Sequence, residues 1–278
     1  MKRLLLIFLA CLGFCSKLRA QEEDFQRYAG LDSLLTQFYQ VLERESVEVK
    51  SAEFDSLIGM VYDSLARQHV TLRVLNHNMH GRVMGEEAVA IHIFDTWLAS
   101  GKVQATSEFE YLEAEMFANC NRRSLLGMQA EKITLYKPCG GKKTIPEDGK
   151  VAVLFFYDTS CAKCRLESMV LPGVLDEVDF PMNLYAVYAS DNRRDWKAFR
   201  RNFKINNKNV RLIHLWDPEF DSDYQRIYGV TGTPRMFLIW SDGEILGRRL
   251  EVENLAQMIQ LIKSVNATQK ENQEVLSR

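Results

Sequence analysis

Two cysteines stand two residues apart in the segment FFYDTSCAKCRLE, where Cys161 and Cys164 follow an apolar run and open a sequence typical of a helix. The first turn of a helix carries unpaired backbone N–H groups and a partial positive charge, and both favour thiolate over thiol. Thiolate is the nucleophile of disulfide exchange, and a second thiol at this spacing can resolve the mixed disulfide that the first one forms. The pattern therefore predicts a redox-active dithiol.

The same spacing is half of a zinc site, which needs about four ligands, usually including a second close pair of Cys or His. No cysteine follows Cys164, and His214 is the only histidine that does. Upstream, Cys120 and Cys139 are too far apart in sequence to be a second such pair. Redox chemistry is therefore the favoured interpretation, without a metal or another cofactor. Metal binding and an inert structural disulfide remain as alternatives.

Cys120 and Cys139 are the other two cysteines of the chain beyond residue 20. In an oxidising compartment they could pair and join two domains, stay free, or exchange disulfides with Cys161 and Cys164. Sequence alone does not show whether their Cα atoms are close enough for a disulfide. All three interpretations stay open at this point.

The chain begins MKRLLLIFLACLGFCSKLRAQ, with a basic start, a short apolar stretch and a small residue before Gln21. These features are typical of a secretory signal, and the apolar stretch is too short for a permanent membrane span. We expect residues 1–20 to be removed by cleavage after Ala20, which places the protein in the periplasm or cell envelope. Ala10 before Cys11 makes lipoprotein anchoring at Cys11 an alternative.

Composition excludes some function classes. The sequence is 46% hydrophobic and 26% charged, as in ordinary globular proteins. Loss of residues 1–20 removes four basic residues and no acidic one, which changes the net charge from −2 to −6. A negative chain of this kind is a poor candidate for nucleic-acid binding, and no later segment is apolar enough to span a membrane.

Residues 21–124 are predicted to form a small helical domain. Apolar residues recur there at steps of three and four in the segments 31–43, 54–68, 86–100 and 109–120. This spacing places them on one face of each helix, so we expect four or five helices packed as a bundle. Their aromatic and methionine side chains are interpreted as core and not as a cofactor pocket.

From about residue 125 the pattern changes to short apolar runs that alternate with helical segments. The runs cover 133–136, 151–157, 183–190, 210–216 and 235–240, and the helical segments cover 161–178, 193–203, 222–229 and 252–265. Alternation of this kind predicts βαβ units and a mostly parallel central sheet flanked by helices. We assign residues 125–266 to this α/β domain and expect the polar tail 267–278 to fray.

The order of these motifs resembles the thioredoxin fold, and more narrowly the exported TlpA/ResA type of thiol:disulfide oxidoreductase. The resemblance is carried by the lead-in LLGMQAEKITLYKPCGGKKTIPEDGK, by the cysteine pair on a strand-to-helix turn, and by YGVTGTPRMFLIWSDGEIL. It implies that Cys161 attacks and that Cys164 resolves. It also implies that Thr233-Pro234 is a cis-proline turn beside the cysteines, where the backbone of Thr233 binds an incoming substrate strand; an ordinary trans proline is the alternative.

Three positions depart from the familiar thioredoxin pattern. Ser160 replaces the usual tryptophan, Ala162-Lys163 stands between the cysteines, and Phe155 occupies the place of a buried carboxylate. Lys163 is expected to lower the pKa of the thiol, although an exposed ammonium contributes little. Asp158 is the nearest acid, and we interpret it as a turn or cap residue.

Two further segments have simple structural interpretations. His77 and His80 in HNMH share a helix face, a spacing that can bind metal, but without a paired acid or cysteine a solvated surface cluster is favoured. Segment 193–204 holds six basic residues around Trp196, Phe199 and Phe203. An amphipathic helix with a basic outer face explains it, and a docking surface for an acidic partner is the alternative.

The helical part also resembles a domain of unknown function that precedes thioredoxin domains in exported proteins of Bacteroides-type bacteria, on segments 76–98 and 112–132. This resemblance brings no activity with it.

The predicted function is an exported disulfide reductase whose partners are disulfide-bearing envelope proteins and a thiol electron donor in the membrane. A metal- or protein-binding module is the alternative. A peroxidase is disfavoured because Asp158 stands where that chemistry needs threonine, with Thr159 one residue too close.

Overall fold

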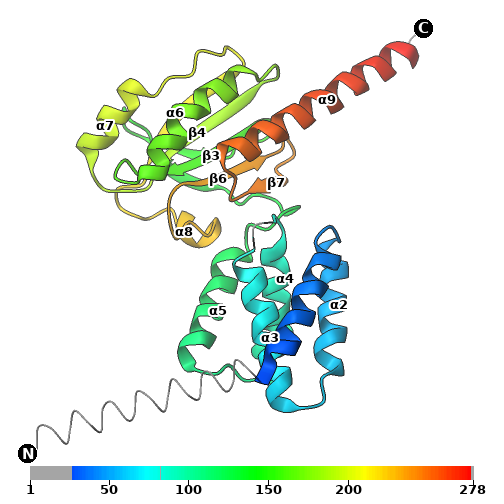
Figure 1. The fold of residues 1–278 in the computed structure, drawn as a ribbon. Coiled ribbons are helices and arrows are strands. Elements are labelled where there is room, and N and C mark those ends of the chain that lie inside the picture. Colours follow the sequence, from blue (N-terminus) through cyan, green and yellow to red (C-terminus); the bar gives the residue numbers. More distant parts are fainter. Residues whose placement is uncertain (1–26, 82, 277–278) are drawn as a thin grey trace, which may run out of the picture. The chain divides into compact units, whose positions relative to one another are not determined.

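The computed structural model describes residues 27–81 and 83–276, with side chains up to residue 265. These residues form two compact units (Figure 1). One is a helical unit of residues 27–81 and Glu86–Glu115, and the other comprises Val83–Gly85 and the chain from Met116 onward. Each unit is described by itself.

The predicted signal segment, its cleavage point at Ala20 and the alternative anchor Cys11 lie outside the described residues. Among the helices that the structure does describe, none combines the length and apolar character that a bilayer span requires.

The first unit is all helical, as predicted. It contains a helix over residues 27–42, α2 (Val47–Met60), α3 (Ser64–Met79), α4 (Glu86–Ile93), the π-helical η1 (Phe94–Leu98) and most of α5 (Glu108–Asn121). The prediction of one helix over 54–68 is wrong, because residues 61–63 are not helical and separate α2 from α3. The Asp63 carboxylate accepts a hydrogen bond from the backbone N–H of Ala66 at 2.8 Å and so starts a new helix.

Buried aliphatic and aromatic side chains hold this unit together, among them Phe54, Ile58, Val74 and Val89. Full burial of such a side chain contributes about 1.5–3 kcal/mol to folding. The Asp55 carboxylate adds a polar link, because Trp97 Nε1 donates to it at 2.7 Å and His92 Nε2 lies 2.7 Å from its other oxygen. These contacts join α2 to α4 and η1.

The second unit is built on a seven-stranded sheet in the order β2-β1-β5-β4-β3-β6-β7. Its strands are β1 (Ile133–Tyr136), β2 (Lys142–Ile145), β3 (Val151–Tyr157), β4 (Met182–Tyr188), β5 (Val210–Trp216), β6 (Arg235–Ile239) and β7 (Ile245–Arg248). All seven residues of β3 are buried, as expected for a central strand covered on both faces.

The mixed sheet confirms the predicted fold class, but the expectation of mostly parallel strands is wrong. Only β3, β4 and β5 run parallel, whereas β6 pairs antiparallel with β3, and β7 with β6. At the other end, β1 pairs antiparallel with β2 and β5. The short β1–β2 and β6–β7 connections allow only hairpins, because a parallel crossover needs a dozen or more residues.

Helices cover both faces of the sheet. Side chains of α6 (Ala162–Asp176), α7 (Arg193–Asn202) and α9 (Val252–Leu276) pack into one buried cluster with Phe155, Leu184 and Met236. On the other face, α8 (Tyr224–Ile227) packs against Phe156 and Phe237. The backbone of α9 is helical to Leu276, so the polar tail assigned from residue 267 continues this helix. The Gln, Lys and Glu residues of that tail are good helix formers.

Candidate active site

Strand β3 delivers the cysteine pair to the carboxyl edge of the sheet, and the loop that follows it is fixed by local hydrogen bonds. Asp158 Oδ1 accepts from the backbone N–H of Ser160 at 2.8 Å, as expected for a turn residue. The Arg165 guanidinium donates to the carbonyls of Thr159 and Ser160 at 3.1 and 3.2 Å. These bonds hold the chain that leads into Cys161.

Cys161 is the N-cap residue of α6, as its place before a helix predicts. Its Sγ accepts a hydrogen bond from the backbone N–H of Cys164 at 3.1 Å, and its thiol donates to the carbonyl of Thr233 at 3.3 Å. Both cysteines are free thiols, Cys161 half-buried and Cys164 only 2% exposed. The helix terminus therefore presents one accessible sulfur with the second directly behind it.

The two thiols differ in acidity. Burial opposes ionisation of Cys161, but hydrogen bonds from the Cys164 thiol and from backbone N–H groups outweigh it and hold the pKa of Cys161 below its ordinary value. For Cys164, burial raises the pKa to about 12. At neutral pH the accessible thiol is thus the more ionised one, and the buried thiol keeps its proton.

Thr233-Pro234 is a cis peptide bond, as the resemblance implies, and it lies directly beside Cys161. The YGVTGTP loop that carries it depends on Gly229, whose φ is +59°. A Cβ atom there would stand 2.6 Å from the carbonyl oxygen of Cys120, so only glycine allows this approach. The loop is thereby packed against the end of α5.

Lys163 points to a different partner than the sequence suggests. Its ammonium pairs with the carboxylate of Glu251, and both side chains are more than half exposed. The contribution of Lys163 that lowers the pKa of Cys161 comes from its backbone N–H. Glu167 makes a second link between these segments, because its carboxylate accepts from the N–H of Val252 at 2.8 Å.

Phe155 is fully buried in β3. The position where the resemblance implies a buried carboxylate is therefore filled by an apolar ring. His214 lies in β5, where its ring meets Phe199 and Phe203 edge-on. Burial and the cations Arg200 and Lys204 lower the pKa of His214 to about 4. His214 is therefore a neutral packed residue near α7.

The remaining cysteines and the histidines of HNMH lie on other elements. Cys120 is half-buried in α5 and Cys139 is exposed, and both are free thiols. The His77 ring stacks on Tyr39 with centroids 3.7 Å apart, and His80 Nδ1 lies 3.1 Å from the carbonyl oxygen of Asn76. Over residues 27–81 and 83–276, no three His, Cys, Asp or Glu side chains are grouped as a metal site.

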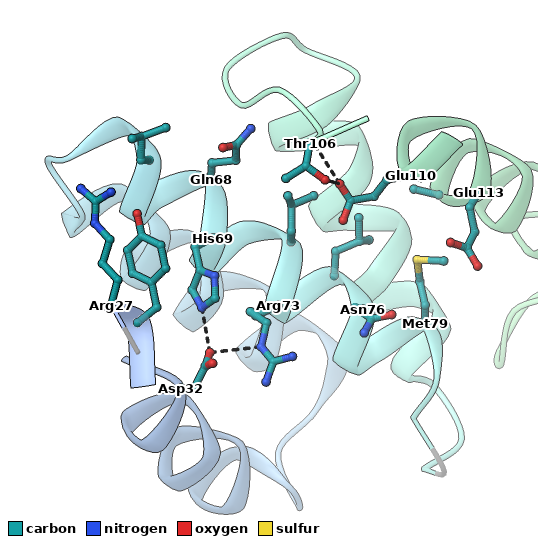
Figure 2. Close-up of a pocket in the computed structure, with 15 residues that line it drawn as sticks. Arg27, Asp32, Gln68, His69, Arg73, Asn76, Met79, Thr106, Glu110 and Glu113 are labelled. Carbon is teal, nitrogen blue, oxygen red and sulfur yellow. Dashed lines mark hydrogen bonds and ion pairs between the residues drawn. The ribbon is translucent and has the colours of Figure 1, made fainter. Parts of the chain in front are cut away.

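The helical unit contains a pocket of about 630 Å³ that sequence reasoning missed (Figure 2). On one wall, Asp32 bridges His69 Nε2 at 2.8 Å and Arg73 Nε at 3.1 Å, and Tyr28 stacks on the His69 ring. Across the pocket, Glu110 accepts from the backbone N–H and hydroxyl of Thr106. The hydrogen bonds of these polar groups are made among themselves. Helical periodicity does not predict the pocket, because its lining residues come from different helices.

Comparison with known proteins agrees with the fold of the second unit. Residues 141–265 match the family model described as a thioredoxin-like domain. No curated protein sequence is similar enough to the chain to be a match.

Solved structures are similar over different parts of the chain. A thioredoxin-like protein from Bacteroides caccae is 12% identical, with a TM-score of 0.67 over 83% of each chain. The thioredoxin domain of a Bacteroides vulgatus thiol-disulfide oxidoreductase is 21% identical over 49% of this chain and 96% of that one, with a TM-score of 0.44. The first similarity shows a shared fold, and its coverage extends beyond the second unit into the helical unit.

Proposed function

We propose that this chain, in which residues 141–265 form a thioredoxin-like domain, is an exported thiol:disulfide oxidoreductase that reduces disulfides of envelope proteins. The observation that carries the proposal is the unequal pair of thiols at the start of α6. Cys161 is accessible with a lowered pKa, and Cys164 is buried directly behind it. This arrangement suits nucleophilic attack by the first thiol and resolution by the second.

In the proposed reaction the Cys161 thiolate attacks one sulfur of a client disulfide. A bond forms between Cys161 Sγ and that sulfur, the client S–S bond breaks, and the other client sulfur leaves as a thiolate. Cys164 then gives up its proton to the released thiolate and attacks Cys161 Sγ. The Cys161–Cys164 bond forms, the mixed disulfide between Cys161 and the client breaks, and the second client sulfur leaves as a thiolate that takes a proton from water. The products are a Cys161–Cys164 disulfide and a client dithiol, so two electrons have moved to the client. A thiol electron donor in the membrane would restore the reduced pair.

The groups around Cys161 support this sequence of steps. The carbonyl of Thr233 and the adjoining cis-proline turn lie against the attacking sulfur, where an extended client segment can align by backbone hydrogen bonds. Leu166, Met169 and Val170 form an exposed apolar strip further along α6. Such a strip suits contact with an unfolded or partly folded client.

Reduction of insulin by the purified protein in the presence of dithiothreitol tests the proposal. Wild type should accelerate insulin reduction, Cys161→Ser should abolish the acceleration, and Cys164→Ser should trap a mixed disulfide. Isolation of that adduct from cells, together with fractionation of the envelope, identifies client and compartment. An inactive wild type that retains one metal ion per chain would reject the proposal in favour of a metal-binding module.

A further inference from the structure

Helix α7 carries a concentrated positive charge on its outer face. Six basic residues lie in or directly after this helix: Arg193, Arg194, Lys197, Arg200, Arg201 and Lys204. Its apolar side chains Trp196 and Phe203 are buried beneath it. The single acid of α7, Asp195, is held near its start by Asn192, whose amide donates to it at 2.6 Å. The helix and the residue that follows its C-cap therefore carry six basic side chains against one acidic side chain.

These cations differ from basic residues elsewhere in the same unit. Lys132, Lys142 and Lys163 each pair with a carboxylate. Within the part of the chain that the structure describes, none of the six basic residues of α7 forms such a pair. Six positive charges against the single negative charge of Asp195 lie along about 15 Å of helix. The positive charges repel one another, and an anionic partner would relieve that repulsion.

A hollow marks where such a partner would bind. A surface depression of about 400 Å³ is lined by the cationic side chains of Lys197, Arg200, Arg201 and Lys204. Arg200 Nε is buried and has no hydrogen-bond partner among the described residues. The Arg200 guanidinium lies 4.7 Å above the Trp196 ring, which fixes its position. Four cationic side chains around one depression, without a carboxylate among them, indicate a site for an anion.

The cationic helix lies next to the cysteine site. The ring of Tyr157, the last residue of β3, stacks on Phe199 of α7 with centroids 4.2 Å apart. Tyr188 at the end of β4 contacts both Tyr157 and Thr159 in the loop before Cys161. Helices α6 and α7 are drawn over the same face of the sheet in Figure 1, in agreement with their shared core cluster.

We infer that the outer face of α7 is a docking surface for an acidic segment of the protein whose disulfide reacts at Cys161, an inference that rests on the proposed function. A polypeptide is favoured over a lipid surface because α7 keeps its apolar face buried, whereas a membrane-binding helix inserts that face. Complementary charge of this kind raises the rate of encounter and orients the partner.

Binding of a labelled peptide tests the docking surface without any disulfide chemistry. The probe is a cysteine-free peptide with eight glutamates in a Gly/Ser chain, and its control has glutamines at the same places. Fluorescence anisotropy with reduced wild-type protein at 20 mM salt should show binding of the glutamate peptide only. Raising the salt to 500 mM should abolish this binding, because the Debye screening length at that ionic strength is only a few ångströms.

Matched charge reversals locate the surface. Lys197→Glu should weaken binding of the glutamate peptide about fivefold, and Lys197→Glu/Arg201→Glu about twentyfold. Lys150→Glu makes the same change of charge at an exposed lysine before the start of β3, at the edge opposite Cys161, and should leave affinity within twofold. Equal weakening by Lys150→Glu would overturn the inference.

Two further probes separate other anions. Binding of millimolar inorganic phosphate in the hollow, without binding of the glutamate peptide, would show that the hollow is only a small-anion site. That result would overturn the inference. Vesicles containing phosphatidylglycerol that bind through Lys197 and Arg201, again without peptide binding, would also overturn it. Because the peptide lacks cysteine, failure in the insulin assay rejects the proposed reductase, whereas failure of peptide binding rejects only the docking surface.

Discussion

Polar side chains of the helical unit and the thiol at the start of α6 are used in different ways. In the helical unit they satisfy one another: Asp32 holds His69 and Arg73, and Asp55 holds Trp97 and His92. In the second unit the sulfur of Cys161 is accessible, and hydrogen-bond donors around it favour the thiolate. Polar groups that pair with one another contribute stability, whereas an accessible thiol with a lowered pKa contributes reactivity.

The largest expected effect lies at Cys161. Cys161→Ser should lower the rate of disulfide reduction at least about a thousandfold, because an alcohol is scarcely ionised near neutral pH. The free energy of unfolding should change by less than about 1 kcal/mol, because the residue is half-buried and keeps its size. Stopped-flow kinetics and urea denaturation measure the two quantities. A large loss of stability would contradict the division between reactive and stabilising groups.

His214 should control stability in acid. Its pKa of about 4 in the folded chain lies below the ordinary 6.5, so below pH 6.5 the unfolded chain binds a proton that the folded chain binds only near pH 4. The contribution of neutral His214 to the free energy of unfolding is therefore fully present above pH 6.5. It falls by about 3 kcal/mol as the pH drops to 4, at about 1.4 kcal/mol per pKa unit. His214→Phe should lose less stability than wild type between pH 7 and 4.5 in urea denaturation. An unchanged loss would show that His214 is not responsible.

In the helical unit, Asp55→Ala should reduce the free energy of unfolding by about 2 kcal/mol, because it removes the acceptor of the Trp97 indole N–H in a nearly buried side chain. Glu53→Ala on the same helix is the control, since Glu53 is exposed, and should change it by at most about 0.5 kcal/mol. Rates of disulfide reduction should stay unchanged in both variants. A fall in the reduction rate of Asp55→Ala together with its stability would contradict this difference between the two units.

The smallest effect is expected at Lys163. The reduction rate should fall as the pH drops through the pKa of Cys161, because the thiolate fraction falls. Lys163→Met should move the midpoint of this profile by less than about 0.3 pH unit, since its exposed ammonium is paired with Glu251 and its backbone N–H is retained. Glu251→Gln is the complementary variant. A shift of a full pH unit would assign the tuning to the ammonium.

Long, strongly patterned segments could be predicted from sequence, and short exposed ones could not. The apolar runs of β3, β4 and β5 indicated central strands because all or most of their residues are apolar. The strands β2 and β7 were missed, since Lys142–Ile145 is mostly polar and Ile245–Arg248 is only four residues long. Edge strands bury few residues, so their sequences carry a weak signal.

The sequence by itself determined that Cys161 and Cys164 open a helix after a buried strand, because that placement follows from local spacing and hydrophobic pattern. Only the tertiary structure decided how the two thiols differ. Burial of Cys164, the carbonyl of Thr233 beside Cys161, and the pairing of Lys163 with Glu251 all come from segments distant in the chain. The acidity of a thiol depends on burial and on neighbouring donors, and these exist only once distant segments have packed together.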